Sequence, residues 1–385
     1  MPEFLLLWEI PVFYAIIIAS KLYHQGVNRM KQFDPSIPVL NHHCHVCFPH
    51  PIDEALENYE KMFQRMAISG AGLLSCPGSG HNGGSLDVLE NLKMLYLKDR
   101  LSIPCYAYAG FTWHGDDAGA YGQFARDMLE MGFDGFKTLE MHPRLRKQFG
   151  KGLNHPAFSE FFRVLSDHEC VMVNHVGEPR GSWNRATATE DAIRLGRVYD
   201  KSHLTLDQLH AEMEEVVARY RKIKFIFAHF YFISDNYDRC CQLMEENPNF
   251  YLDLTPGAGM CVNFNKDPEL WYDFFLRYAD RIILGSDLYG IDAGEDRYDL
   301  TRNFLEGTSP IPHSLGTIYP MPRPLPREVL EKIYRNNVLR LQGCDPRPIN
   351  REKIYAHCLD IEKQYGNQLT DMGKKNLKTM MAYWK

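Results

Sequence analysis

From Val39 onward, short apolar runs rich in β-branched and aromatic residues alternate with longer amphipathic segments. The short runs have the residue types of buried strands and predict eight of them: Val39–His45, Ala71–Ser75, Cys105–Ala109, Gly135–Thr138, Cys170–His175, Lys224–His229, Phe250–Leu254 and Arg281–Asp287. The amphipathic segments predict a helix after each strand: Ile52–Ser69, Leu86–Lys98, Tyr121–Met131, His155–Ser166, Leu206–Arg221, Asn236–Glu246, Asp267–Tyr278 and Arg327–Leu341. Strands that each precede a helix are typical of an α/β fold of the (β/α)8 TIM-barrel type, which we expect here.

An open, doubly wound sheet is the main alternative for a chain in which strands and helices alternate. Such a sheet carries a Gly-rich phosphate loop after its first strand. Pro49 and His50 stand where those glycines would fall, so the sequence favours the closed barrel.

The barrel is predicted to span residues 39–343, between an N-terminal apolar extension (1–38) and a C-terminal helical tail (344–385). The most apolar stretch, residues 4–20, is interrupted by Glu9 and Pro11 and has no preceding Lys or Arg, so it is a poor secretion signal. Basic residues follow it where a membrane anchor would need them, and that alternative stays open. We expect an extension of a cytoplasmic protein instead.

Composition narrows the classes of partner. Apolar residues make up 45% of the 385 residues and charged residues 24%, which is ordinary for a globular protein. The net charge of −6 offers no bulk attraction for a nucleic acid or an anionic membrane, so we expect a small-molecule substrate. The 10 Cys lack the spacing of a disulfide scaffold and are expected to be reduced, whereas the 16 His are an unusually high count.

Substrate recognition is expected on the long connections that follow predicted strands two, three, five and eight. Barrel enzymes build their sites from the loops after the strands. Basic and aromatic groups on two of these loops suit a polar or carboxylated substrate, and the candidates are Arg180, Trp183, Arg185, Trp113 and His114.

The densest chemical signal is the segment Asn41–Cys47 at the end of the first predicted strand. Alternation along a strand places His43 and His45 on one face, and His42 and Cys44 on the other. If the first face is the barrel interior, the two imidazoles converge at the mouth of the barrel.

Three more ligand-type residues end later strands: His175 on strand five, His229 on strand six and Asp287 on strand eight. Closure of a barrel brings strands one and eight together, so the set can surround one cation. Neutral imidazoles and a carboxylate suit zinc, and also manganese or iron, with a position left open for water or substrate.

Simpler interpretations exist for each part of this set. A single buried histidine is more often a hydrogen-bonded core residue than a ligand, but the joint placement at strand ends favours a metal site. Cys44 and Cys47 form a Cys-x-x-Cys pair, yet residues three apart in a strand face opposite ways, and the chain has no second pair to complete a zinc site.

These motifs resemble the amidohydrolase superfamily, specifically the amidohydrolase-related branch that holds lactonases and decarboxylases like aminocarboxymuconate-semialdehyde decarboxylase. The matching segments lie between about Val39 and Gly343 and are His43–His45, Gly132–Lys137, Asn174–Gly177, Ala228–Phe230, Leu284–Asp287 and Glu331–Val338. The resemblance implies a metal-dependent barrel enzyme and a possible homodimer, but it does not imply one reaction.

By this resemblance, His43, His45, His175 and Asp287 would bind the metal. His229 is a ligand in some members and an acid, a base or a substrate-polarising group in others. Asp287 and His229 are therefore our candidate catalytic residues.

Two positions complicate the resemblance. Asn41 stands where the family usually has Asp, which alters the support of the site. In binuclear members a carbamylated lysine at the position of Lys137 bridges two metals, whereas in this branch an unmodified lysine there meets an anionic substrate. We expect one metal, most simply zinc, with Lys137, Glu140 and His142 as candidates for a second metal or a substrate anion.

The sequence leaves two reactions open. In the first, a metal-activated water hydrolyses an amide, a lactone or a related ester, with Asp287 moving the proton and His229 stabilising the oxyanion. In the second, an unsaturated or aromatic acid loses carbon dioxide and takes a proton from His229 or Asp287. A non-catalytic barrel that serves as a binding module is a third possibility, and the intact residue set argues against it.

Overall fold

The computed structural model describes residues 33–45, 50–77, 87–255, 257–289, 295–307, 309–313 and 315–385, apart from the side chains at 191, 289 and 295. The apolar stretch 4–20, Cys47 and Leu86 lie outside these ranges, and so do parts of the long connections after strands two and eight.

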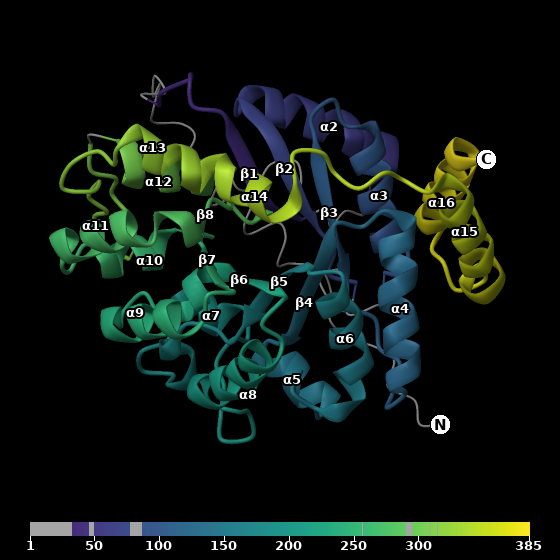
Figure 1. Cartoon of the computed structure of the whole chain (residues 1–385), viewed down its shortest axis with the longest axis horizontal. Helices are drawn as coiled ribbons and strands as arrows, with labels where there is room; N and C mark the ends of the chain where they lie inside the picture. Colours follow the sequence, from purple (N-terminus) through teal and green to yellow (C-terminus); the bar gives the residue numbers. More distant parts are fainter. Residues whose placement is uncertain are drawn as a thin grey trace.

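The strands form one parallel sheet that curves into a barrel (Figure 1). The strands are β1 (Val39–His45), β2 (Ile68–Leu74), β3 (Cys105–Gly110), β4 (Gly135–Met141), β5 (Val171–Val176), β6 (Lys224–Phe227), β7 (Phe250–Asp253), β8 (Ile282–Ile283) and β9 (Leu288–Tyr289). β8 lies within the predicted eighth strand and pairs with β7, whereas β9 follows directly after the predicted strand and pairs with β1. Between them, the His42 amide donates to the Leu284 carbonyl at 3.1 Å and completes the ring. The predicted TIM barrel is confirmed.

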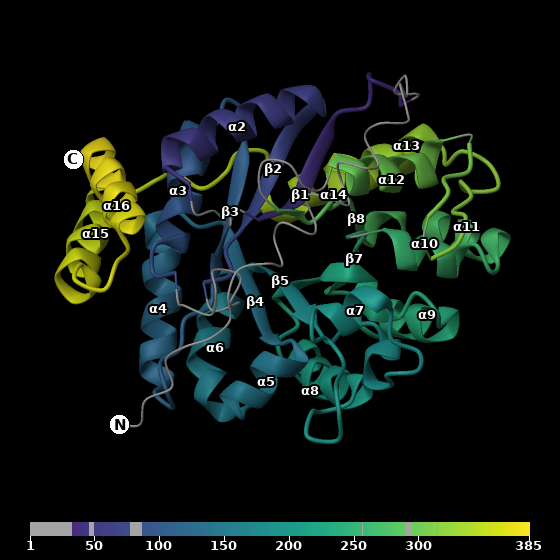
Figure 2. The same cartoon turned by 180° about the vertical axis from the view of Figure 1, so that it is seen from behind.

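Helices cover the outside of the sheet, as Figures 1 and 2 show from opposite sides. The helices of the βα units are α2 (Ile52–Arg65), α3 (Glu90–Arg100), α4 (Ala118–Met131), α6 (Ser159–Asp167), α8 (Leu206–Arg219), α9 (Tyr237–Glu246), α11 (Pro268–Arg277) and the pair α13 (Arg327–Glu331) and α14 (Asn337–Gln342). Shorter or additional helices are α5 (Pro143–Phe149), α7 (Glu190–Arg194), α10 (Ala258–Phe264) and α12 (Glu295–Glu306). These four lie in the connections and were not predicted.

Several predicted element boundaries are wrong, and left-handed residues account for three of them. Helix α2 ends before Ala67, whose φ of 51° stops the helix and lets β2 begin at Ile68 rather than at Ala71. Strand β6 ends at Phe227 because His229 has a φ of 58°. β8 also ends earlier than predicted, at Ile283 rather than at Asp287, and Asp287, with a φ of 53°, directly precedes β9.

Two apolar layers show which face of each strand is internal. Inside the barrel, side chains from β1 to β8 form one cluster: Leu40, Leu74, Tyr106, Tyr108, Val171, Val173, Ile226, Tyr251 and Ile283, joined by Val338 of α14. The larger cluster lies between the strands and the helices. Strand residues two apart from a member of the inner cluster therefore point into the barrel, which places His175 and Asp253 on the inner face. Lys137 of β4 is the register partner of Val173 in β5 and lies on the same face.

The N-terminal end of the barrel is closed by α14 and by a buried ion pair. Tyr106 donates to the Gly343 carbonyl at 2.7 Å, and Gln342 donates to Tyr108 at 2.8 Å, so the end of α14 lies against the first residues of the strands. The Lys98 ammonium donates to Asp134 at 2.6 Å just before β4.

The C-terminal tail is a hairpin of α15 (Arg351–Tyr365) and α16 (Asp371–Trp384) that packs beside α3 and α4 (Figure 2). The tail also caps the N-terminus of α2, because the Asn376 side chain accepts a hydrogen bond from the backbone amide of Ile52, the first residue of α2, at 2.9 Å. Among the described residues, no helix is long and apolar enough to cross a membrane.

Candidate metal centre

A β-bulge in β1 brings the predicted histidines into the barrel. The register against β2 shifts by one residue between Asn41 and Cys44, so two residues of β1 oppose one residue of β2. His42 consequently points inward as well, where its Nε2 lies 2.6 Å from the Tyr108 hydroxyl. The prediction that His42 faces away from His43 is wrong, since simple alternation cannot foresee a bulge.

His43, His45 and Asp287 form a three-residue group whose possible ligand atoms all lie within 4.8 Å of one another. The two Nε2 atoms are 3.0 Å apart, and Asp287 Oδ1 lies 3.5 Å from the first and 3.3 Å from the second. All three side chains are buried. The first strand and the eighth strand thus meet as the sequence predicted.

Hydrogen bonds on the far side of each ring determine the tautomers. His43 Nδ1 lies 2.7 Å from the Asp253 carboxylate, and His45 Nδ1 lies 3.0 Å from the Leu74 carbonyl. Because a carboxylate and a carbonyl can only accept hydrogen bonds, the Nδ1 atom of each ring carries the proton. The Nε2 atom of each ring therefore carries a lone pair. Asp287 Oδ1 has no hydrogen-bond partner among the described residues. Three electron pairs therefore converge without a proton between them, which fits a cation.

His229 reaches the centre through a turn of left-handed backbone. Phe225 and Phe227 pack in the outer layer, so an extended chain would place His229 outside as well. Four consecutive residues from His229 to Phe232 instead have φ between 53° and 58°. Left-handed residues other than glycine are unfavourable, and a cluster of them often marks a functional site.

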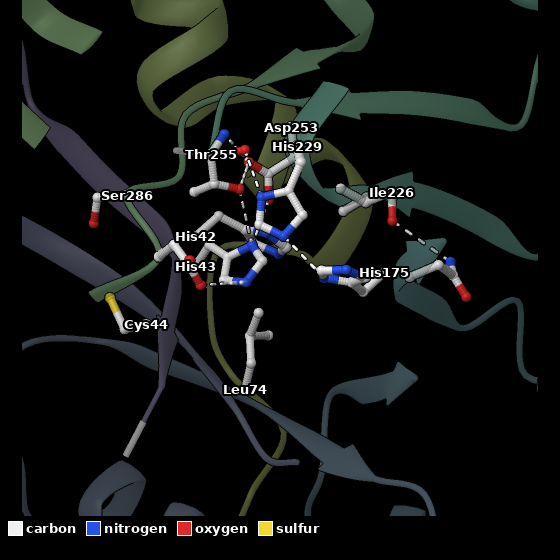
Figure 3. Close-up of polar contacts among 12 residues, drawn as sticks. His42, His43, Cys44, Leu74, His175, Ile226, His229, Asp253, Thr255 and Ser286 are labelled. Carbon is white, nitrogen blue, oxygen red and sulfur yellow. Dashed lines mark hydrogen bonds and ion pairs between the residues drawn. The ribbon is translucent and has the colours of Figure 1, made fainter. Parts of the chain in front are cut away.

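His229 and His175 form a second pair of imidazoles whose unprotonated nitrogens face each other. His229 Nδ1 lies 2.7 Å from the Thr255 carbonyl, and His175 Nε2 lies 3.0 Å from the Gly177 carbonyl, so both protons point away from the centre. The other two nitrogens face each other at 2.9 Å (Figure 3). Burial lowers the pKa of both rings, which keeps them neutral near pH 7 and able to act as ligands.

Lys137 of β4 lies in the same region and has an unusual environment. Its Nζ is buried and has no hydrogen-bond partner among the described residues. Burial lowers the pKa of the amine, while the neighbouring Cys76 and Asp287 oppose that effect. An ammonium group in this position calls for an anionic partner.

A further group of possible ligands comprises His142, His175 and Glu178, again with ligand atoms within 4.8 Å of one another. His142 Nδ1 accepts from the Arg144 amide at 3.3 Å, so its Nε2 carries the proton and donates to Glu178 at 3.1 Å. Because that nitrogen has no lone pair to offer, this geometry fits a hydrogen-bonded pair better than a metal site. Arg197 lies 3.6 Å from the same carboxylate.

Glu140 belongs to neither group. Its side chain is buried and accepts from the Leu139 amide at 2.8 Å. Burial raises the pKa of Glu140 to about 7.

The predicted substrate-binding residues make contacts among the loops. Arg180 forms an ion pair with Asp207 at 2.9 Å, and Trp183 donates to the Leu204 carbonyl at 2.9 Å. Trp113 is 44% exposed, and its ring stacks on Phe149 with 4.9 Å between centroids. Two further residues complete the set: His114, which lies 2.9 Å from the Thr112 hydroxyl, and Arg185, which is exposed. A role in substrate binding stays a prediction for all five.

Three polar residues of the centre were not predicted. Asp253 and Thr255 end strand seven, and the rule that found the other strand-end residues could have found them too. Arg297 of α12 lies 3.3 Å from Asp287 Oδ2, in a long connection whose pattern gave no signal.

Comparison with known proteins identifies the family of the chain. The family profile described as amidohydrolase matches residues 90–343, which include His175, His229 and Asp287. The chain belongs to the amidohydrolase family. Membership makes it a metal-dependent enzyme with the amidohydrolase fold and confirms the resemblance found in the motifs. No curated protein matches the chain.

Solved structures support the barrel fold. A putative amidohydrolase from Staphylococcus aureus has 16% identity and a TM-score of 0.51, over 80% of this chain and 99% of that one. A 4-oxalomesaconate hydratase from Rhodopseudomonas palustris has 12% identity and a TM-score of 0.50, over 85% and 99% of the two chains. A dihydroxybenzoic acid decarboxylase from a Polaromonas species, solved with manganese and 2-nitroresorcinol, has 12% identity and a TM-score of 0.50, over 79% and 96%.

Proposed function

We propose that this amidohydrolase family member hydrolyses an amide, a lactone or a related ester in a small carboxylated substrate. The observation that carries the proposal is the convergence of His43 Nε2, His45 Nε2 and Asp287 Oδ1 with both imidazole protons committed elsewhere. A divalent cation bound by these atoms would supply a water of lowered pKa and polarise the substrate carbonyl. Nitrogen and carboxylate ligands suit zinc first, with manganese and iron as alternatives.

Asp287 is the residue that we propose to move the proton. It accepts a proton from the attacking water and gives it to the leaving group as the carbonyl–heteroatom bond breaks. Arg297, 3.3 Å from Oδ2, holds the carboxylate with Oδ1 toward the histidines. Both oxygens of Asp287 therefore have a defined direction.

The surroundings of Lys137 favour a substrate that carries a carboxylate. A buried ammonium without a hydrogen-bond partner among the described residues is unfavourable, and a substrate carboxylate would pair with it. This pairing would place the anionic end of the substrate on the β4 side of the centre.

We assign His229 a role other than the stabilisation of an oxyanion that the sequence led us to expect. Stabilisation of an oxyanion needs a proton on its Nε2, but the Thr255 carbonyl keeps the proton of the neutral ring on Nδ1. We propose that His229 and His175 are cation ligands together. Metal stoichiometry separates the two possible arrangements: one equivalent means that they complete a single coordination shell, and two equivalents mean a second position beside a carbamylated Lys137.

Decarboxylation is the second candidate, and Lys137 favours it as well. A lysine beside the centre would hold the carboxylate of an unsaturated or aromatic acid. The bond from carbon to the carboxylate then breaks, its electron pair stays on the substrate carbon, and that carbon takes a proton that Asp287 or His229 has first accepted from water.

A substrate panel tests the two reactions. Purified, zinc-loaded protein is given carboxylated amides and lactones together with unsaturated and aromatic acids, and both acid production and carbon dioxide release are measured. Hydrolysis predicts acid production that the His43→Ala variant lacks. Carbon dioxide release without hydrolysis would replace the first proposal with the second.

A cytoplasmic location and a homodimer stay predictions.

A further inference from the structure

We propose that Asp253, together with Thr255, is a positioning element that keeps His43 and His229 in the tautomers that leave both Nε2 atoms free for cations. The inference rests on the proposed metal centre and explains how the chain builds it. Neither residue is a metal ligand in this proposal, since both act through the histidines.

Asp253 is a fully buried carboxylate that faces His43. Its Oδ2 lies 2.7 Å from His43 Nδ1, and its Oδ1 accepts from the Thr255 amide at 2.7 Å and from the Thr255 hydroxyl. Both carboxylate oxygens are thus engaged as acceptors. An acceptor that is fixed in this way holds the His43 proton on Nδ1.

Thr255 orients the other histidine with its backbone. The Thr255 carbonyl lies 2.7 Å from His229 Nδ1, and a carbonyl can only accept. Asp253, the last residue of β7, and Thr255, two residues later, therefore set the proton positions of His43 and His229, which come from other strands' ends. Figure 3 shows Asp253 and Thr255 together on one side of these rings.

Close packing keeps this element against His43. A Cβ atom added at Gly285 would lie 2.7 Å from His43 Cβ, 2.8 Å from Asp253 Oδ1 and 2.8 Å from Thr255 Cγ2. The three side chains therefore press on the backbone at position 285, where only glycine fits. Asp253 has no free space on that side into which it could turn.

The substitution Asp253→Asn separates a specific orienting role from mere packing, because it keeps the size of the side chain. The backbone amide of Thr255 is a donor with a fixed direction, so the Asn oxygen would face it and the Asn NH2 group would face His43 Nδ1. His43 would then have to accept there, and its proton would move to Nε2, the atom that faces the cation. The opposite orientation of the Asn amide would set its NH2 against the Thr255 N–H.

The test is the zinc affinity of the full-length protein, measured by titration of the chelator-stripped protein against a competing chelator. We expect D253N to bind zinc about 10- to 100-fold more weakly than wild type, the usual effect of removing such a partner of a ligand histidine. Asp134→Asn is the matched control, because it removes another buried carboxylate at the opposite end of the barrel. It should lower stability and leave the zinc affinity of the folded protein unchanged.

Thr255→Val keeps the proposal testable if D253N does not fold. It removes the hydroxyl, which donates to Asp253 and lies 3.2 Å from His43 Nδ1, and it keeps both backbone contacts, so we expect a loss of affinity of about threefold. Unchanged zinc affinity in folded D253N would overturn the inference, as would unchanged affinity in T255V if D253N is unfolded. Wild-type protein that binds no zinc would instead overturn the proposed function itself.

Discussion

Lys98 and Lys137, two of the buried lysines among the described residues, have opposite surroundings. Lys98, on the side where the strands begin, donates to Asp134 and to the Gly132 carbonyl, each at 2.6 Å. Lys137, on the side where the strands end, has no hydrogen-bond partner among the described residues. At the first end the buried ammonium is paired within the protein, whereas at the second it has no such partner among the described residues, in agreement with our proposal that a substrate carboxylate binds there.

The difference extends to the carboxylates. Asp134 accepts from Lys98 and from the backbone amides of Ala107 and Arg347, at 2.7 Å each for the amides. Asp287 has a left-handed backbone, and its Oδ1 has no hydrogen-bond partner in the part of the chain that the structure describes. This contrast matches the division in TIM barrels between a stabilising N-terminal face and a functional C-terminal face.

The largest effect is expected at the C-terminal face. His43→Ala removes one of the converging lone pairs, so bound metal and catalytic activity should disappear together, with a loss on the order of 10⁴-fold in kcat/KM. The variant should remain folded, because the interactions that stabilise the fold lie at the N-terminal end of the strands. Metal analysis, activity and thermal unfolding of the same sample check all three points. A variant that retains stoichiometric metal would remove His43 from the ligand set.

Asp134→Asn should have the largest effect on stability. Burial lowers the pKa of Lys98 and raises the pKa of Asp134 although the two are paired, so their attraction only partly offsets desolvation. Breaking such a pair leaves a buried, uncompensated lysine and should cost about 3–5 kcal/mol in the free energy of unfolding. Urea unfolding measures this loss. A cost below about 1 kcal/mol would contradict the assignment of stability to this face.

Glu140→Gln is expected to change the pH dependence of stability. Because the folded state raises the Glu140 pKa from 4.5 to about 7, the native protein binds the proton more tightly and loses stability as pH rises through that window. The neutral glutamine lacks this loss, so the variant should gain roughly 2–3 kcal/mol over wild type between pH 4.5 and pH 8. Unfolding curves at the two pH values give the difference. An equal pH dependence in both proteins would refute the effect.

Lys137→Met gives the smallest expected change in stability, and of opposite sign. Methionine has a similar shape without a charge that needs a partner, so the metal-free variant should be more stable by about 1–2 kcal/mol. The same variant should bind carboxylated substrates more weakly. Stabilisation without any effect on KM would show that Lys137 does not contact the substrate.

The sequence allowed the barrel and the strand-end residues to be predicted, because the alternation of strands and helices and the placement of polar residues are local features. It did not allow the directions of the side chains to be predicted where the backbone departs from regular geometry. The bulge in β1 places the neighbouring residues His42 and His43 on the same, inner face, and the left-handed turn at His229 brings inward a residue that alternation would place outside. Arg297 reaches Asp287 from a helix that no pattern indicated.

The central claim is that the inward-facing lone pairs of His43, His45 and Asp287 bind a divalent cation, and the metal content of the full-length protein tests it most directly. Protein incubated with zinc, desalted and analysed by mass spectrometry for metals should retain at least one equivalent per chain, which His43→Ala should lose. Wild-type protein that retains no metal under these conditions would contradict the claim.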